Sequence, residues 1–496
     1  MHQTILPDEM KKLEQTYMAR FAVPGALLME HAAQGIVQAL RERCPGGRVL
    51  FLCGPGNNGG DGYAAARLWQ AAGGKSTVWE TTSRTSPDAA MNRQLLLQAG
   101  IEPLTLEEIP PLRDWDAVVD ALFGTGLDRP ITGLPAELIE AVNASGLPVL
   151  AVDIPSGLGG EDGRCTGPAI RATQTVTFHR VKQGLLLRDG VTHSGKLRLW
   201  PILIPTDWGD VEGLDILEPE ELPRLLPPRP RDGHKGTFGR AVILAGSPGM
   251  AGAAALCANA CIRGGAGLTT LLCRPSLLPI LQVLAPGATC IPLPEREGLL
   301  QPAAALTVAQ ALATADAACV GPGLGRTPDL LAVLRCFAQA ECPVVWDADA
   351  LNLLAGEEEL FPLPENAVIT PHPGEAARLL DCTPAEITED PLAALDALHD
   401  RCGCTVLLKG ARTLMTDGLR RAINRYGTPA MGKGGSGDVL SGILTALLAR
   451  HLPQTPLSCA QMAALLHGLA GLEAEKRLGE NGVTPQGLID AMWVAS

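Results

Sequence analysis

A glycine-rich segment near the C-terminus carries one carboxylate that could act on a bound ligand. The segment reads GKGGSGDVLSG over residues 432–442, and Asp438 is its only acidic residue. Glycines let the backbone approach a phosphate closely, and the amides at the start of the following helix point toward the anion. Asp438 then lies where a reacting group of the ligand would sit, so we predict that it is a general base. The alternative is an ordinary glycine-rich turn between a strand and a helix.

A second group of polar residues follows three apolar runs in the first half of the chain. The loop GPGNNGGDG (54–62) follows the first run, and we expect it to open a helix over 63–69 and to bind phosphate. Oxygen-bearing side chains at the three run ends, Asn58, Asp120 and Ser156, would meet in one crevice. Such oxygens suit a hard cation, which predicts a monovalent cation site. Alternatively, the Asn and Ser side chains only cap loops and helices.

The elements that must position these residues are short apolar runs that alternate with helical patterns. Their continuous apolar character favours parallel strands covered on both faces, with ligands at the carboxyl edge of the sheet. Both halves are therefore predicted to be α/β. A proline-rich segment over 218–230 separates them and is predicted to be a linker between domains over 1–217 and 231–496. The predicted strands cover 48–53, 117–120, 149–153, 241–245, 317–320, 344–347 and 405–408.

The composition is that of a globular enzyme. Of the chain's residues, 46% are hydrophobic and 19% are charged. At 496 residues the chain is too long for one compact core, so we expect at least two domains. A formal net charge of −13 argues against nucleic acid as a partner. The 14 cysteines are scattered without zinc-ligand spacing, which favours reduced thiols. No signal core or long apolar run is present, so we expect a soluble, cytoplasmic protein without a membrane partner.

Four sequence blocks in the first half closely resemble the epimerase domain of the bifunctional NAD(P)H-hydrate repair enzymes. They are GPGNNGGDGYAAAR, DALFGTGLDRP, AVDIPSGL and TFHRVKQGL, and they span most of residues 50–187. The resemblance implies a Rossmann-like doubly wound domain in which Asn58, Asp120 and Ser156 coordinate K⁺. It also makes Asp153 our candidate acid or base for epimerisation at C6 of the nicotinamide ring. The substrate-binding residues that it implies are Asn57, Asn58, Gly59, Gly60, Asp61, Gly124, Thr125, Gly126, Leu127, Asp128, Arg129, Pro130, Asp153 and Lys182.

Two of these residues have simpler interpretations. Lys182 would face the anionic ligand, but it could also be an ordinary surface lysine. His179, in the same block, is predicted to be structural and not catalytic.

The second half resembles the dehydratase domain of the same enzymes, which has a ribokinase-like fold. The matching blocks are HKGTFGR, GSPGMAGAA, GPGLG, DADALN, TPHPGE, KGART and the 432–442 segment. The resemblance implies that Ala253, Gly323, His372 and Asp438 contact the hydrated dinucleotide, with Asp438 catalytic. Lys433 stands where relatives often carry Thr, and it would add a positive charge. The residues implied to bind the adenine nucleotide are Lys409, Gly410, Ala411, Arg412, Thr413, Gly435, Ser436 and Gly437.

Other residues of the second half also have simpler interpretations. His372 stands between two prolines, so it could serve only to make a rigid loop. Asp347 and Asp349 could be metal-related, but they are predicted to be helix caps or supporting residues, and His467 is predicted to pack a helix.

The resemblance implies a metabolite-repair enzyme that acts in two steps. One domain would interconvert the R and S epimers of hydrated NADH and NADPH. The other would dehydrate the S epimer at the expense of ADP, giving AMP and phosphate, with Mg²⁺ on the nucleotide. A homo-oligomer is implied as well. The alternatives are a ribokinase-like small-molecule kinase with an accessory N-terminal domain, and a binding protein without activity built on the epimerase fold.

Overall fold

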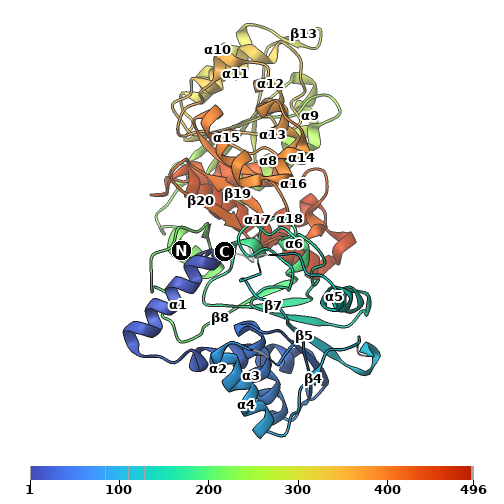
Figure 1. Ribbon diagram of the computed structural model, residues 1–496. Coiled ribbons are helices and arrows are strands. Elements are labelled where there is room, and N and C mark those ends of the chain that lie inside the picture. The colour runs from blue at the N-terminus through green and yellow to red at the C-terminus, as the bar shows by residue number, and fades with distance from the viewer. Residues whose placement is uncertain (1, 84, 110, 128, 493–496) are drawn as a thin grey trace. The chain divides into compact units, whose positions relative to one another are not determined.

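The computed structural model describes residues 2–83, 85–109, 111–127 and 129–492, and the chain divides into two compact units (Figure 1). The first unit is Gln3–Leu214, and the second is formed mainly by Asp215–Ser496. The segment predicted to be a linker contains a 3₁₀ turn, η3 (Pro219–Glu221), and a short helix, α7 (Leu222–Leu225). Leu222 is buried in the core of the second unit, so this part of the segment packs as a piece of that unit.

The first unit is built on a seven-stranded sheet in the order β4-β3-β2-β5-β6-β7-β8, and every pairing is parallel. The strands are β2 (Arg48–Cys53), β3 (Lys75–Glu80), β4 (Leu104–Thr105), β5 (Ala117–Ala121), β6 (Val149–Val152), β7 (Gln174–Phe178) and β8 (Lys196–Trp200). The helices are α1 (Pro7–Phe21), α2 (Gly25–Arg43), α3 (Asn57–Ala71), α4 (Pro87–Gln98), α5 (Leu134–Ala144) and α6 (Gly190–His193), with 3₁₀ turns η1 (Leu112–Asp114) and η2 (Gln183–Leu185).

Helices cover both faces of this sheet. Successive side chains of a strand point to opposite faces, so each strand supplies two cores. Phe51 and Val119 belong to one core with Tyr63 of α3. Leu52 belongs to the other core with Leu138 of α5. The predicted doubly wound domain is therefore confirmed.

The second unit contains an 11-stranded sheet in the order β1-β9-β20-β19-β18-β17-β16-β15-β10-β11-β12. The strands from β18 to β12 in this order are parallel, whereas β19 is antiparallel to both of its neighbours. The strands are β1 (His2–Gln3), β9 (Asp215–Ile216), β10 (Arg240–Leu244), β11 (Leu268–Cys273), β12 (Thr289–Pro292), β15 (Ala317–Val320), β16 (Val344–Trp346), β17 (Val368–Ile369), β18 (Thr405–Leu408), β19 (Thr413–Thr416) and β20 (Arg421–Asn424). A separate hairpin pairs β13 (Glu295–Arg296) with β14 (Leu299–Leu300).

Helices lie on both faces of this sheet too. Ile243 and Cys319 share a core with α8, α16 and α17, and Trp346 meets Phe337 of α11 edge to face, with ring centroids 6.4 Å apart. None of the helices in the described ranges is long and apolar enough to cross a membrane. The helices are α8 (Ala251–Arg263), α9 (Leu278–Leu284), α10 (Ala303–Leu312), α11 (Leu330–Ala338), α12 (Asp349–Leu354), α13 (Pro373–Leu380), α14 (Pro384–Glu389), α15 (Pro391–Cys402), α16 (Ser436–Ala449), α17 (Pro456–Leu478) and α18 (Pro485–Ala491), with 3₁₀ turns η4 (Pro275–Leu277), η5 (Glu358–Leu360), η6 (Pro429–Met431) and η7 (Glu480–Gly482).

The start of α3 differs from the prediction. The helix begins at Asn57 and not at residue 63, so the Asn-Asn-Gly-Gly-Asp stretch forms its first turns. Glycine is a poor helix former, which made this stretch look like a loop. It is required here because a Cβ on Gly59 would lie 2.0 Å from the carbonyl oxygen of Gly54. The helix start therefore lies directly against the end of the preceding strand.

Candidate active sites

The first candidate site lies at the carboxyl ends of β2, β5 and β6. A Cβ on Gly54 would lie 1.6 Å from the carbonyl oxygen of Leu122, so the turns after β2 and β5 are in direct backbone contact. A Cβ on Gly124 would lie 3.2 Å from the Cβ of Asn58. These two close approaches bring the start of α3 against the turn that follows β5.

The predicted cation ligands meet at this point. Ser156 donates its hydroxyl to Asp120 Oδ1 at 2.6 Å and its backbone amide to Oδ2 at 2.8 Å. Its hydroxyl oxygen also accepts the Phe123 amide at 2.9 Å. Burial raises the pKa of Asp120 to about 6, although both hydrogen bonds from Ser156 oppose the shift. The side-chain nitrogen of Asn58 is buried and has no hydrogen-bond partner among the described residues. The oxygens of Asp120 and Ser156 are of the kind that bind a cation, whereas the unpartnered Asn58 atom is a nitrogen donor, so the monovalent cation site stays a prediction.

Asp153 and Lys182 form an ion pair beside this cluster. The Lys182 ammonium lies 2.5 Å from Asp153 Oδ1 and also donates to the Phe178 carbonyl at 3.0 Å. The same carboxylate oxygen accepts the Thr177 hydroxyl at 3.1 Å and the Phe178 amide at 3.2 Å. Asp153 has φ of +62°, in the left-handed region, and Lys182 is only 1% exposed. The alternative that Lys182 is a surface lysine is therefore wrong.

The remaining predicted residues of this site have different surroundings. Gly59 and Gly60 are buried in α3, whereas Asn57 is exposed and accepts the Ser86 hydroxyl at 2.5 Å. His179 is buried, and burial lowers its pKa to about 4. In the loop after β5, Gly124, Thr125 and Leu127 are half-buried, Gly126, Arg129 and Pro130 are exposed, and Asp128 lies outside the described residues.

Sequence reasoning missed Glu14, which lines a cavity of about 90 Å³ together with Asn57 and Asp61. Its helix, α1, is mostly polar, so a glutamate on it looks like any solvent-facing residue. One signal was present: Glu14 lies four residues after buried Met10 and one after buried Leu13, on the inner face of the helix. Burial raises the pKa of Glu14 to about 7 and that of Asp61 well above its ordinary value.

The second candidate site is at the start of α16. Gly435 precedes the helix with φ of +99°, and Ser436, Gly437 and Asp438 form its first turn. A Cβ on Gly437 would lie 3.5 Å from the ammonium of Lys409, which comes from the end of β18. Ser436 Oγ lies 3.3 Å from His467 Nε2, so this buried histidine contacts the first turn besides packing α17. The predicted catalytic carboxylate, anion-binding turn and nucleotide loop are therefore adjacent.

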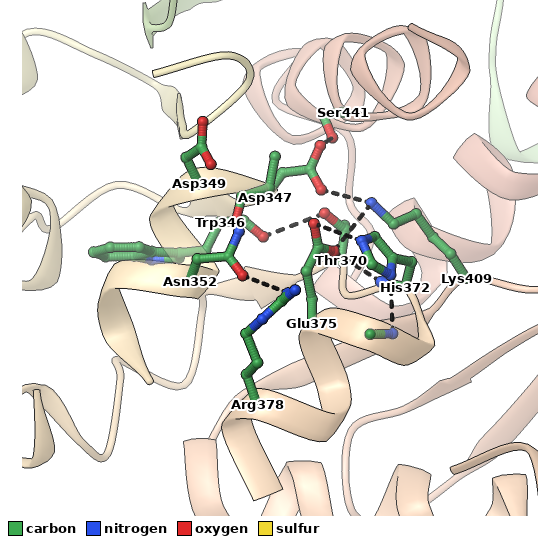
Figure 2. Close-up of polar contacts among 12 residues, drawn as sticks. Trp346, Asp347, Asp349, Asn352, Thr370, His372, Glu375, Arg378, Lys409 and Ser441 are labelled. Carbon is green, nitrogen blue, oxygen red and sulfur yellow. Dashed lines mark hydrogen bonds and ion pairs between the residues drawn. The ribbon is translucent and has the colours of Figure 1, made fainter. Parts of the chain in front are cut away.

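Figure 2 shows a connected group of polar side chains that includes Lys409, Asp347 and Ser441 of α16. Lys409 lies 2.7 Å from Asp347 Oδ1 and 3.7 Å from Glu375 Oε2. The other Asp347 oxygen accepts the Ser441 hydroxyl at 2.7 Å. His372 Nε2 lies 3.2 Å from Glu375 Oε1. Lysine, carboxylates and imidazole thus form one chain of contacts that ends at the buried Asp347.

This group of charges sets the protonation behaviour of Asp438. Burial raises the pKa of Asp438 to about 7, Asp347 adds to the rise, and Lys409 opposes it. Burial alone would lower the pKa of Lys409, but Asp347 and Glu375 outweigh burial and raise it. A carboxylate with a pKa near neutrality beside a permanently charged lysine is suited to accept a proton from a bound hydroxyl.

The two aspartates predicted to be helix caps do more than cap. Asp347 is 1% exposed and bridges Lys409 to α16, which is the supporting role predicted as the alternative to a cap. Asp349 begins α12, accepts the Gly325 amide at 2.9 Å and pairs with Arg326 at 2.9 Å. It therefore holds the 321–325 turn against α12.

The predicted dinucleotide contacts lie on neighbouring turns. A Cβ on Gly323, which has φ of +58°, would lie 2.8 Å from the Cβ of Ala253. Ser247 donates to the Gly323 carbonyl at 2.9 Å, which joins the turn after β10 to the turn after β15. His372 precedes α13, and its Nδ1 accepts the Gly374 amide at 2.9 Å, so it also makes the loop rigid.

Two basic residues of the second site differ in exposure and contacts. Lys433 donates to the carbonyls of Asn481, at 2.8 Å, and Val483, so its charge is held by these carbonyls. Burial lowers the pKa of Arg412, and nearby Arg425 lowers it further. In the rest of the predicted nucleotide loop, Gly410 and Ala411 are exposed and Thr413 begins β19.

The fold and the two sites define an α/β protein with a Rossmann-like unit and a ribokinase-like unit. Residues 25–184 match the family model described as "YjeF-related protein N-terminus", and residues 241–493 match the model described as "NAD(P)H-hydrate dehydratase". The bifunctional NAD(P)H-hydrate repair enzyme of Moorella thermoacetica is 36% identical over 97% of this chain and 94% of its own. That of Escherichia coli is 37% identical over 94% and 88%. The chain belongs to the family of bifunctional NAD(P)H-hydrate repair enzymes.

Two solved structures resemble the second unit. An ADP/ATP-dependent NAD(P)H-hydrate dehydratase from Bacillus subtilis, co-crystallised with ATP and Mg²⁺, is 27% identical. It covers 57% of this chain and 97% of its own, with a TM-score of 0.50. A ribokinase-like superfamily protein from Enterococcus faecalis is 26% identical over 58% of this chain and 98% of its own, also with a TM-score of 0.50. The predicted ribokinase-like fold is confirmed.

Proposed function

We propose that the first unit epimerises hydrated NADH and NADPH at C6, and that the second unit dehydrates the S epimer with ADP. The observation that carries the dehydratase assignment is the position of Asp438 in the first turn of α16, with the Lys409 ammonium beside Gly437. Relatives named for NAD(P)H-hydrate repair match nearly the whole chain, and this supports both activities in one polypeptide.

The dehydration needs a better leaving group than hydroxide. Asp438 removes the proton of the C6 hydroxyl, whose oxygen then attacks the terminal phosphorus of ADP and displaces AMP. The C6–O bond next breaks with loss of phosphate, and a proton leaves the neighbouring carbon to form the ring double bond. The amides of 435–437 and the Lys409 ammonium stabilise the charge of the transferring phosphoryl group.

The nucleotide is held by Lys409, Gly410, Ala411, Arg412 and Thr413 together with the first turn of α16. Mg²⁺ supplies charge neutralisation on the nucleotide phosphates when it is bound. The described residues contain no group of three His, Cys, Asp or Glu side chains that could hold a metal, so we assign it no protein site. ADP is our choice over ATP, and the Bacillus subtilis dehydratase is named for both nucleotides.

The epimerase site binds the dinucleotide on the start of α3, the 124–130 loop, Asp153 and Lys182. Asn58, Asp120 and Ser156 would hold K⁺, which would supply positive charge for an anionic substrate. The buried ammonium of Lys182, fixed by Asp153, adds a second positive charge. Both charges favour an anionic substrate at the helix start.

Absorbance at 340 nm tests both activities. The intact protein is mixed with a chemically prepared R/S mixture of hydrated NADH, with ADP and Mg²⁺, with ATP and Mg²⁺, or without nucleotide. Full recovery of NADH with ADP is expected. Recovery that stops near half would leave the dehydratase without the epimerase, and no recovery with either nucleotide would overturn the proposal.

The alternative of a small-molecule kinase gives a different result. A kinase would release a stable phosphorylated product from a hydroxymethyl or sugar substrate and would not restore absorbance at 340 nm. A homo-oligomer remains a prediction, which size-exclusion chromatography with light scattering tests.

A further inference from the structure

The cavity beside the epimerase helix start is lined by three carboxylates, those of Glu14, Asp61 and Asp88, and otherwise mostly by apolar residues. Glu14 and Asp61 line it together with Met29, Phe178 and Ile202, and its volume of about 90 Å³ is more than one water molecule needs. Asn57 also contributes to the lining, which joins the cavity to the predicted substrate-binding turn. A charged group of the protein in such a place is costly unless a partner or a ligand compensates it.

Among the described residues, neither Glu14 nor Asp61 has a hydrogen-bonded partner that would compensate its charge. In the parts of the chain that the structure describes, no hydrogen bond or ion pair involves the side chain of Glu14 or Asp61. Asp153 behaves differently, because three donors occupy its Oδ1 and one of them is the Lys182 ammonium. Asp153 thus holds Lys182 through Oδ1 and stays a predicted acid or base of the epimerisation, whereas Glu14 is free to exchange a proton with a ligand.

Burial and the surrounding charges place the pKa of Glu14 near neutral pH. Burial raises its pKa to about 7; Lys182 lowers it and Asp153 raises it. The charges of Asp153 and Glu14 also raise the pKa of Asp61. Asp88 is a further carboxylate that lines the cavity. A carboxyl group with this pKa can give and regain a proton within one turnover.

We propose that Glu14 is a catalytic acid and base of the epimerase site, acting on the C6 hydroxyl of the hydrated nicotinamide ring. This inference rests on the proposed epimerase function. Glu14 donates its proton to the hydroxyl, the C6–O bond breaks, and water leaves as the lone pair of the ring nitrogen forms a double bond to C6. Water then adds to the other face of C6, the electron pair returns to nitrogen, and the released proton goes back to Glu14. Substrate and product differ only in configuration, so no oxidant or reductant is required.

The test uses the intact protein and the purified R epimer of hydrated NADH without nucleotide, so that the dehydratase step is silent. Chromatographic separation of the two epimers gives the exchange rate from pH 5.5 to 9 for the wild type, Glu14→Gln, Glu14→Asp and the control Glu137→Gln. Glu137 is exposed in the first turn of α5. Thermal unfolding of the same preparations, followed by circular dichroism, checks that the first unit of each variant is folded.

Glu14→Gln should lower the exchange rate about 100-fold or more and remove the inflection near pH 7. Glu14→Asp should keep the inflection at a reduced rate, and Glu137→Gln should match the wild type. Exchange in H₂¹⁸O should place one labelled oxygen at C6 for each inversion.

The outcomes separate this inference from the proposed function. No exchange by the wild type would overturn the epimerase assignment itself. Exchange by the wild type with an unchanged rate and pH profile in Glu14→Gln would overturn the role of Glu14 and leave the epimerase assignment standing. If Glu14→Gln does not fold, a wild-type profile without an inflection near pH 7, or inversion without ¹⁸O, contradicts the inference.

Discussion

Lys409 and Asp347 form a 2.7 Å ion pair directly behind the first turn of α16. The ammonium is also within 3.5 Å of where a Cβ on Gly437 would stand. One positive charge therefore lies between a buried carboxylate and the predicted phosphate-binding turn. Because Asp347 also accepts Ser441, the ion pair is tied to the helix that carries Asp438.

Replacing the predicted base should abolish dehydration selectively. Asp438→Asn is expected to lower the turnover of the S epimer by roughly 10²–10⁴-fold. Wild-type turnover should rise with pH through about 7, because burial and Asp347 raise the pKa of Asp438 to about 7 and the base acts ionised. Stopped assays at saturating ADP from pH 5.5 to 9 measure the profile. Unchanged epimer exchange in the variant is the control, and residual turnover with the wild-type profile would contradict the assignment.

Removing the lysine should leave a buried charge without compensation. Lys409→Met is expected to lower the free energy of unfolding by about 3 kcal/mol, because Asp347 is 1% exposed. The double variant Lys409→Met with Asp347→Asn should recover part of this loss. Urea unfolding of the single and double variants forms the cycle, and strictly additive effects would show that the two residues are not coupled.

Replacing K⁺ by another cation should lower the epimerase activity and leave the dehydratase activity unchanged. With K⁺ replaced by tetramethylammonium, epimer exchange should fall while dehydration of the pure S epimer continues. Ser156→Ala should give the same loss in K⁺, because it removes one oxygen from the set around Asp120. Equal loss of both activities would place the cation effect elsewhere in the chain.

Replacing Gly54 or Gly126 of the first unit by alanine should have very different effects on stability. A Cβ on Gly54 would lie 1.6 Å from the Leu122 carbonyl, whereas a Cβ on Gly126 meets nothing within 4 Å. Gly54→Ala should destabilise the unit by several kcal/mol through a backbone clash, and Gly126→Ala should change stability by less than about 0.5 kcal/mol. Thermal unfolding followed by circular dichroism compares them. Similar melting of both variants would contradict the close packing of the β2 and β5 turns.

The stability of the first unit should depend on the charge of Glu14. Its pKa is raised from 4.5 to about 7 by folding, so its contribution is complete below about 4.5 and is lost as the pH rises through 7. Glu14→Gln removes this titration. The difference in free energy of unfolding between the variant and the wild type should therefore be about 2 kcal/mol more in favour of the variant at pH 8 than at pH 5. Urea unfolding at both pH values measures the difference, and an equal effect at both would contradict it.

The strands could be predicted because parallel strands that are buried on both faces are continuously apolar. Val118 and Val119 face opposite cores, so neither face of β5 needs polar residues. The carboxyl-edge positions of Asp120 and Ser156 followed from the same pattern. The helix start at Asn57 could not be predicted, because glycines that are required by close backbone packing look like helix breakers.

Contacts between residues that are far apart in the sequence could not be predicted either. Asp347 meets Lys409 across 62 positions, and no local pattern marks such a pairing. Glu14 lies on a polar helix far from Asp61 in the chain, so only the folded unit shows that they share a cavity. Domain limits and site roles remain predictions.

The division of the chain between Leu214 and Asp215 fixes the ratio in which the two sites are produced. All described residues of one candidate site come from Gln3–Leu214, and all those of the other come from beyond it. Each translated polypeptide therefore delivers the two sites in a one-to-one ratio. Changes in gene expression raise or lower both capacities together, and only selective inhibition or proteolysis could alter their balance.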